Sequence, residues 1–269
     1  MLAVRDWSLG ARLGVLAALL AVFVLALALH GPIAQDPRFH LFADQRTCLG
    51  IPHFGNVVSN GAFALVGWIG LVVVGSAGRG GMFAHAADRW CYVVFFAGVA
   101  AVSLGSAYYH AAPDTPRLFW DRLPMTVAFM ALCAAFLTDR IPPLRGARWV
   151  LPALLGIGVA SAFYWRWTEG IGAGDLRPYV VVQFFPMLAL PLVCLMFPPG
   201  RTTSGAHLAW LMAWYGAAML CERLDHEIYA VLGGAISGHS LKHLLAALAP
   251  LVVARMLAVA VQRPAEKSA

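Results

Sequence analysis

Residues 179–197 read YVVVQFFPMLALPLVCLMF, an apolar run without a charged side chain. A helix needs about 20 mainly apolar residues to cross the hydrocarbon core of a bilayer, so this run is long enough to span a membrane. Similar runs recur along the chain between polar, glycine- and proline-rich connections, and the alternation typical of β-barrel strands is absent from the sequence. The predicted helices cover residues 13–29, 57–74, 91–109, 123–137, 149–165, 179–197, 207–221 and 241–261. The pattern predicts an all-α integral membrane protein.

The composition of the chain also indicates a membrane protein. Hydrophobic residues make up 61% of the 269 positions and charged residues only 12%, too few to cover a soluble globule of this size. The net charge of +6 comes from Lys and Arg residues scattered between apolar runs, so no nucleic-acid partner is expected. Of the five cysteines only Cys48 lies in a polar connection, which favours neither a disulfide framework nor a CxxC metal site.

We divide the chain into three segments. Residues 1–30 are interpreted as an extra N-terminal transmembrane helix or a signal peptide, because Arg5 and Arg12 precede an apolar run that ends in Ala-Leu-Ala. The run is longer than a signal-peptide core of about 7 to 15 residues, which favours a retained helix. Residues 31–262 are expected to form a seven-helix membrane domain, and residues 263–269 a polar tail.

The charged residues indicate how the predicted helices are oriented. With the N-terminus in the cytoplasm, 11 of the 19 Lys and Arg residues fall on the inner side, as the positive-inside rule requires. Nine of the 13 acidic residues fall on the outer side. We therefore expect both termini in the cytoplasm and a cluster of carboxylates at the outer rim.

Three histidines are expected to meet at that outer rim. His110 ends the third predicted helix, while His239 and His243 open the eighth, so the alternating helix directions bring them to one level. His239 and His243 are four residues apart and share a helix face. Three histidines with an open fourth position form a ligand set typical of catalytic zinc. The sequence predicts a zinc site with coordinating nitrogens within about 3 to 4 Å of each other.

Two further polar residues are placed at the same level. Ser106 lies one turn before His110 on the same face, where its hydroxyl can bind water or an oxyanion. Asp121 begins the fourth predicted helix and is a candidate general base or a partner that orients a histidine. Each feature has a structural alternative: interfacial histidines, or a helix-start acid paired with Arg122. Their convergence favours a functional site, because ionisable groups at membrane depth are costly.

These residues carry a resemblance to a known family. The stretch Ser106-Ala-Tyr-Tyr-His110, Asp121 eleven positions later and His239-Ser-Leu-Lys-His243 resemble the alkaline ceramidases, which belong to a superfamily with the adiponectin and progestin receptors. The resemblance covers residues 52–248 and includes Val-Ser-Asn at 58–60. It implies a seven-helix bundle around the acyl chain of a sphingolipid amide, zinc on the three histidines, and catalytic roles for Ser106 and Asp121.

From the resemblance we expect a zinc-dependent hydrolase that cleaves the amide bond of ceramide or a related N-acyl lipid. Zinc would polarise the carbonyl and supply hydroxide, Asp121 would handle the proton, and Ser106 would help to hold the oxyanion. The expected location is a bacterial inner membrane, with the active site toward the outer face. The sequence indicates no oligomeric state.

Two alternatives belong to other functional classes. One is a receptor or lipid-binding protein of the same superfamily, in which zinc is structural and no substrate is turned over. The other is a metal transporter, which we rank last. Transport requires ionisable groups along a pathway near the membrane midplane, whereas the predicted ligands lie at one rim.

The chain departs from the family before the first core helix. Members with a calcium site carry an acidic cluster and a Glu in this region, where the present sequence has Asp44, Cys48 and His53. Calcium takes about six to eight oxygen ligands, and residues 36–60 offer only the carboxylates of Asp36 and Asp44. Calcium binding is therefore in doubt, and activity is not expected to require it.

Overall fold

The computed structural model describes residues 4–261, and the regular secondary structure of this part is helical. The α-helices are α1 (Leu9–His30), α2 (Phe54–Val58), α3 (Gly61–Arg79), α4 (Ala86–Ala111), α5 (Thr115–Arg140), α6 (Val150–Gly170), α7 (Arg177–Met196), α8 (Gly205–Arg223), α9 (Asp225–Val231) and α10 (Gly238–Val261), and the short 3-10 helices are η1 (Val4–Asp6), η2 (Pro37–His40) and η3 (Pro142–Leu144). The expected tail at residues 263–269 lies outside the described residues.

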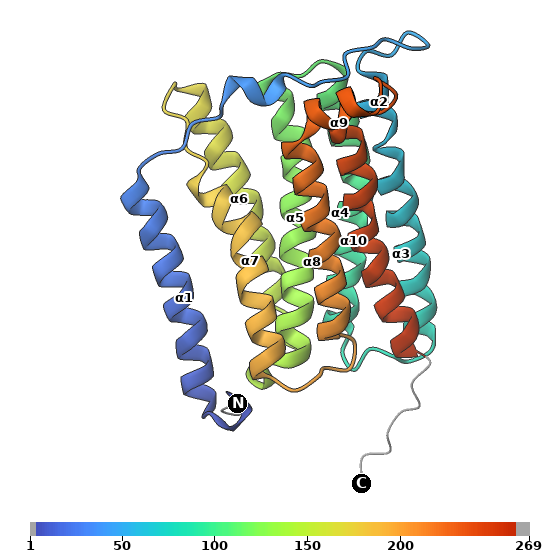
Figure 1. The fold of residues 1–269 in the computed structure, drawn as a ribbon. Helices are drawn as coiled ribbons and strands as arrows, with labels where there is room; N and C mark the ends of the chain where they lie inside the picture. Colours follow the sequence, from blue (N-terminus) through green and yellow to red (C-terminus); the bar gives the residue numbers. More distant parts are fainter. Residues whose placement is uncertain (1–3, 262–269) are drawn as a thin grey trace.

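Within residues 4–261, seven helical segments are long and apolar enough to cross a membrane, namely α1, the α2–α3 segment, α4, α5, α6, α7 and α10. The helix predicted at residues 207–221 is α8, which is not among these seven segments but lies in the bundle against α10. The seven core helices are thus α3 to α8 and α10, and α1 precedes them (Figure 1). The all-α membrane fold expected from the sequence is confirmed.

Helix α1 stands at the side of the bundle and contacts α7 (Figure 1). The Arg12 guanidinium donates a hydrogen bond of 3.0 Å to the carbonyl of Met196 and lies over the ring of Phe197. Farther along α1, the rings of Phe23 and Phe185 have centroids 6.0 Å apart. These contacts attach α1 to one edge of the core and leave most of its surface exposed.

One end of the bundle contains the three histidines, and we call it the histidine end. Helix α4 ends there, α5 and α10 begin there, and the segment between α1 and α3 runs across it (Figure 1). This crossing segment includes η2 and α2, and α9 lies at the same end. The histidine end is therefore covered by residues far apart in the sequence.

Two of the differences from the predicted helices bear on the site. Helix α5 begins at Thr115 and not at residue 123, because the Asp114 carboxylate caps it by accepting a 2.6 Å hydrogen bond from the amide of Arg117. Asp121 consequently lies within the helix. The single helix predicted for residues 57–74 is interrupted, since Ser59 and Asn60 side chains donate hydrogen bonds to backbone carbonyls of α2.

Candidate metal centre

The three predicted histidines converge at the histidine end. His110 on α4 and His239 and His243 on α10 are all buried. The ring centroids form a nearly regular triangle, with distances of 4.7, 4.8 and 4.9 Å. The Nε2 atoms of His110 and His239 are 3.2 Å apart, and one ring nitrogen from each histidine lies within 4.8 Å of the other two.

This geometry fits a shared metal ion. Two nitrogens bound tetrahedrally to zinc at about 2.0 to 2.1 Å lie roughly 3.3 Å apart, which matches the His110–His239 distance of 3.2 Å. The Nε2 atoms of His110 and His239 meet the predicted spacing of 3 to 4 Å. The ligand nitrogens of all three histidines lie within a wider distance, 4.8 Å, of one another. The convergence is confirmed, and the cluster can hold a metal ion.

Close helix packing positions α4 and α10, the two helices that carry the histidines. A Cβ atom on Gly105 would lie 2.0 Å from the carbonyl oxygen of Trp120, so only glycine allows α4 to approach α5 this closely beside Ser106. A Cβ on Gly238 would lie 2.4 Å from the carbonyl oxygen of Cys221. Glycine at this position lets the first turn of α10 pack against the end of α8, one residue before His239.

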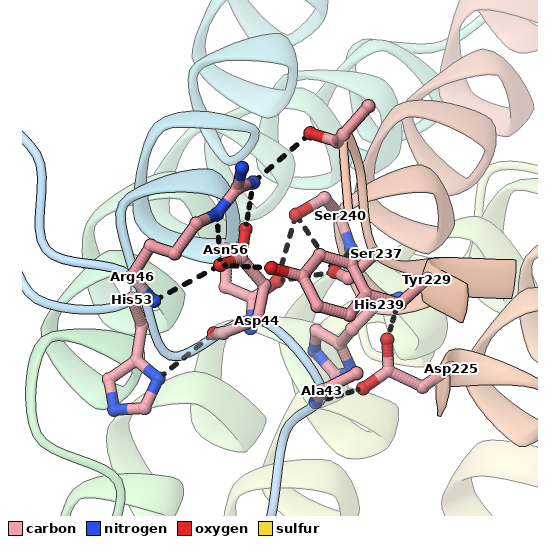
Figure 2. A network of polar contacts seen from close by, with 11 residues as sticks. Ala43, Asp44, Arg46, His53, Asn56, Asp225, Tyr229, Ser237, His239 and Ser240 are labelled. Atoms are coloured by element: carbon pink, nitrogen blue, oxygen red, sulfur yellow. Dashed lines mark hydrogen bonds and ion pairs between the residues drawn. The ribbon is translucent and has the colours of Figure 1, made fainter. Parts of the chain in front are cut away.

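Neighbouring side chains orient two of the histidines. The Ser59 hydroxyl lies 2.8 Å from Nδ1 of His243, which leaves Nε2 to face the cluster. The Asp225 carboxylate accepts hydrogen bonds from the backbone amides of His239, at 2.7 Å, and Ala43, at 2.9 Å (Figure 2). A hydrogen bond to the second ring nitrogen, as in the Ser59–His243 contact, is the usual means of orienting a metal-binding histidine, whereas Asp225 fixes the backbone of His239.

A phenylalanine from the crossing segment covers the cluster. Phe42 is buried, and its ring centroid lies 4.7 Å from that of His110 and 4.4 Å from that of His239. Tyr109 lies beside it, with its hydroxyl 2.8 Å from Nδ1 of His40. The aromatic layer keeps this side of the histidines dry, which strengthens electrostatic interactions there.

Ser106 and Asp121 lie near the histidines, in the wall of a cavity that His243 also lines. Both side chains are buried, and they are close enough for the Ser106 hydroxyl to interact with the Asp121 carboxylate. None of the ion pairs found in residues 4–261 joins Asp121 to Arg122, which removes the alternative explanation of Asp121 as one half of a surface pair.

The cavity has a volume of about 370 Å³ and extends from these residues into the bundle. Its polar groups at the histidine end include Arg122 and an ion pair, in which the Lys242 ammonium lies 2.5 Å from the Glu222 carboxylate. The remaining wall is mostly apolar and is contributed by several core helices, with side chains such as Phe95, Leu190 and Pro250. The cavity therefore joins a polar end to a long apolar interior.

A second polar cluster lies nearby, in the crossing segment before α3. Asp44 is buried, and both of its carboxylate oxygens accept 2.8 Å hydrogen bonds from the Arg46 guanidinium (Figure 2). Hydrogen bonding to Arg46 is the main reason why the pKa of Asp44 is held below its usual value. Arg46 also donates to the carbonyl of Ala235, which links the crossing segment to the loop before α10.

The same cluster extends to the start of α10. The side-chain oxygen of Asn56 accepts hydrogen bonds from the hydroxyls of Ser237, at 3.1 Å, and Ser240, at 2.8 Å (Figure 2). A Cβ on Gly55 would lie 2.9 Å from both the Asp44 carboxylate and the Ser240 hydroxyl. Whether calcium binds remains a prediction, but the Asp44 carboxylate already has an internal cation.

Sequence reasoning missed several supporting residues. The Asp225 carboxylate, which has no part in the predicted site, holds the His239 backbone. His40 was assigned no role and bonds to Tyr109. The signal was weak in each case, because the partners lie far away in the sequence and no local spacing connects them.

Comparisons with protein-family models, curated proteins and solved structures return no match for this chain. The fold and the site define it as a helical membrane protein with a buried three-histidine cluster that can hold a metal ion.

Proposed function

We propose that this chain is a zinc-dependent intramembrane amidohydrolase that cleaves ceramide or a related N-acyl lipid. One observation carries the proposal: His243, Ser106 and Asp121 line a single cavity whose other walls are mostly apolar. The polar end suits a scissile amide, and the apolar interior suits an acyl chain. The resemblance to alkaline ceramidases supports the same assignment, since it gives these residues the same roles.

The metal would be held by His110, His239 and His243. Zinc in a three-histidine site acts as a Lewis acid on a carbonyl oxygen and makes a water molecule more acidic. Because Ser59 contacts one ring nitrogen of His243, the other is the nitrogen available to the ion. Phe42 excludes solvent from the opposite side of the cluster.

The side chains of the cavity wall would carry the proton transfers. Asp121 accepts a proton as the oxygen of water attacks the amide carbon, and the proton then goes to the nitrogen as the C–N bond breaks. The Ser106 hydroxyl donates a hydrogen bond to the carbonyl oxygen as negative charge develops on it. The products are a fatty acid and an amine, so all atoms of substrate and water are accounted for.

The orientation in the membrane is part of the proposal. The positive-inside rule favours cytoplasmic termini in a bacterial inner membrane, with the histidine end outside. A lipid from the outer leaflet would then reach the cavity with its headgroup at the histidines.

Purified protein in detergent tests the proposal. We expect bound zinc and release of fatty acid from at least one class in a panel of ceramides, other N-acyl lipids and ester lipids. Ser106→Ala should lower the rate, whereas the control Ser103→Ala should not, because the Ser103 hydroxyl donates to the carbonyl of Ala100 and is outside the cavity lining. Bound zinc without hydrolysis of any lipid would support a receptor with a structural metal.

A further inference from the structure

Arg122 is a buried cation in the cavity wall. Its exposed fraction is 8%, and it lines the cavity one residue after Asp121. None of the ion pairs found in residues 4–261 includes Arg122. Its Nη1 atom is buried and has no hydrogen-bond partner within the described part of the chain. A buried guanidinium of this kind normally requires an acceptor.

Aromatic rings hold the guanidinium in place. The central carbon of Arg122 lies 4.4 Å from the ring centroid of Trp165, 5.0 Å from Tyr179 and 5.5 Å from Phe39. Cation–π contacts stabilise the charge through the flat faces of the guanidinium. The rings do not accept hydrogen bonds from the N–H groups at the edge of the guanidinium, and the arrangement of these N–H groups matches the geometry of a carboxylate. The aromatic cage therefore fixes the orientation of Arg122 and leaves donor capacity for an anion.

The other charged residues of the cavity do not satisfy Arg122. Lys242 and Glu222 pair with each other. Asp121 precedes Arg122 on α5, but successive side chains on a helix point about 100° apart, and the Asp121 carboxylate is near Ser106. Arg122 is thus a cavity cation that forms no ion pair among the described residues, and the Asp121 and Glu222 carboxylates act on it only from beyond ion-pair distance.

The position of Arg122 indicates which part of a lipid it would meet. Its neighbour Phe39 belongs to η2, in the segment that crosses the histidine end. The deeper wall is apolar and includes Leu190, Ala249 and Pro250. An acyl chain in the apolar interior would leave the amine half of an N-acyl lipid at the histidine end, beside Arg122.

We propose that Arg122 binds a carboxylate on the amine half of the substrate, so that N-acyl amino acids are preferred over neutral N-acyl lipids. This inference rests on the proposed function and deepens it by naming the substrate class. A charge-assisted, two-point hydrogen bond between guanidinium and carboxylate is among the stronger polar interactions in proteins. It selects lipids with a carboxylate over lipids that carry a hydroxyl in the same place.

A matched pair of lipids tests the preference. N-palmitoylglycine and N-palmitoylethanolamine share the acyl chain and the amide and differ in a carboxylate against a hydroxymethyl group. We expect kcat/KM of the parent protein to be at least about 10-fold higher for N-palmitoylglycine. Arg122→Gln should bring the ratio of the two values close to one, and Arg122→Lys should leave an intermediate ratio, because it keeps the charge without the planar fork.

Arg117→Gln is the matched control. Arg117 lies on α5 at the same end, pairs with Asp114, is partly exposed and is outside the cavity lining. Its replacement removes the same charge and should leave the ratio unchanged. An equal change in both glutamine variants would show a general effect of surface charge and would overturn the inference. So would an unchanged ratio in Arg122→Gln accompanied by a lower melting temperature, since that result means a purely structural cation.

Two carboxylates are available to Arg122, one on the headgroup of the substrate and one on the released fatty acid. Inhibition by palmitate distinguishes them. If Arg122 binds the released fatty acid and not the headgroup, palmitate will inhibit the parent protein more than Arg122→Gln while the parent hydrolyses the two lipids equally. That result contradicts the headgroup assignment.

Ligand-induced shifts in melting temperature give an answer without turnover. N-palmitoylglycine should stabilise the parent protein more than N-palmitoylethanolamine, and equal shifts would overturn the inference. If no lipid is hydrolysed but the shifts differ, the proposed function fails while anion binding stands. If both lipids are hydrolysed equally and the shifts are equal, only the inference about Arg122 fails.

Discussion

The histidine end contains two polar clusters that differ in how their groups are satisfied. In the Asp44 cluster, the buried carboxylate receives two hydrogen bonds from Arg46, so that charge is balanced within the chain. In the histidine cluster, ring nitrogens from two helices point at one another across 3.2 Å, and His110 has a buried Nδ1 without a partner among the described residues. A cluster whose polar groups are paired within the chain is typical of a structural role, whereas converging nitrogen ligands are typical of a metal site.

Asp225 connects the two clusters. Its carboxylate binds the amide of Ala43, next to Asp44, and the amide of His239 (Figure 2). The internally balanced cluster therefore serves as a scaffold for the metal-binding one. Changes in the first should affect stability, and changes around the second should affect chemistry.

The largest effect is expected from Asp121→Asn. This substitution keeps the shape of the side chain but removes the charge, so hydrolysis should fall by roughly 100-fold or more while the zinc content and the fold are retained. Fatty-acid release and metal content measure the two properties on the same preparation. Asp114→Asn is the control, because asparagine also caps a helix and Asp114 is outside the cavity lining. Equal rates in the parent and Asp121→Asn would exclude a proton-transfer role.

A smaller effect, on stability, is expected from Arg46→Met. Asp44 is 1% exposed, so the variant leaves a buried carboxylate without its cation. We expect a loss of about 1 to 3 kcal/mol in the free energy of unfolding, with zinc still bound in the folded protein. Thermal unfolding in detergent measures the loss, and Arg38→Met is the control because its ion pair with Asp36 is exposed. Complete loss of zinc from folded Arg46→Met would mean that the two clusters cannot be separated.

The pH dependence of that loss follows from the pKa of Asp44, which Arg46 holds below the usual value of 3.8. A carboxylate with a lowered pKa in the folded state stabilises the protein above its usual pKa, and the stabilisation disappears as the pH falls through the lowered value. The difference in melting temperature between the parent and Arg46→Met should therefore be constant from pH 7 to 5 and shrink below about pH 4. A difference that grows on acidification would contradict this assignment.

No effect is expected from calcium. Arg46 already donates to both Asp44 oxygens, and the segment offers few other carboxylates for an ion that takes about six to eight oxygen ligands. Selective removal of calcium should change neither activity nor melting temperature. A loss of activity that added calcium restores would show that this segment binds the ion after all.

The sequence predicted the features that depend on local pattern. Apolar runs located the helices, alternation of direction brought His110 to the level of α10, and the four-residue spacing put His239 and His243 on one face. The start of α5 was predicted too late, because the Asp114 cap lies before the apolar run. Hydropathy detects the apolar part of a helix and not the polar turns that precede it.

The features missed depend on contacts between distant segments. The cage around Arg122 combines rings from η2, α6 and α7, and Arg46 reaches Ala235 across 189 positions. A pairing of Arg122 with Asp121 was a structural alternative that the sequence left open, and no such ion pair forms among the described residues. Only the packed bundle shows which charges meet.

The metal content of purified protein tests the central claim most directly. We expect about one zinc per chain in the parent protein, as a single three-histidine site requires, and almost none in His243→Ala. His226→Ala is the matched control, because His226 is exposed at the same end and lies near the Leu41 carbonyl outside the cluster; it should retain the metal. A parent protein free of zinc after purification and reconstitution, or a His243→Ala variant that keeps its zinc, would contradict the account.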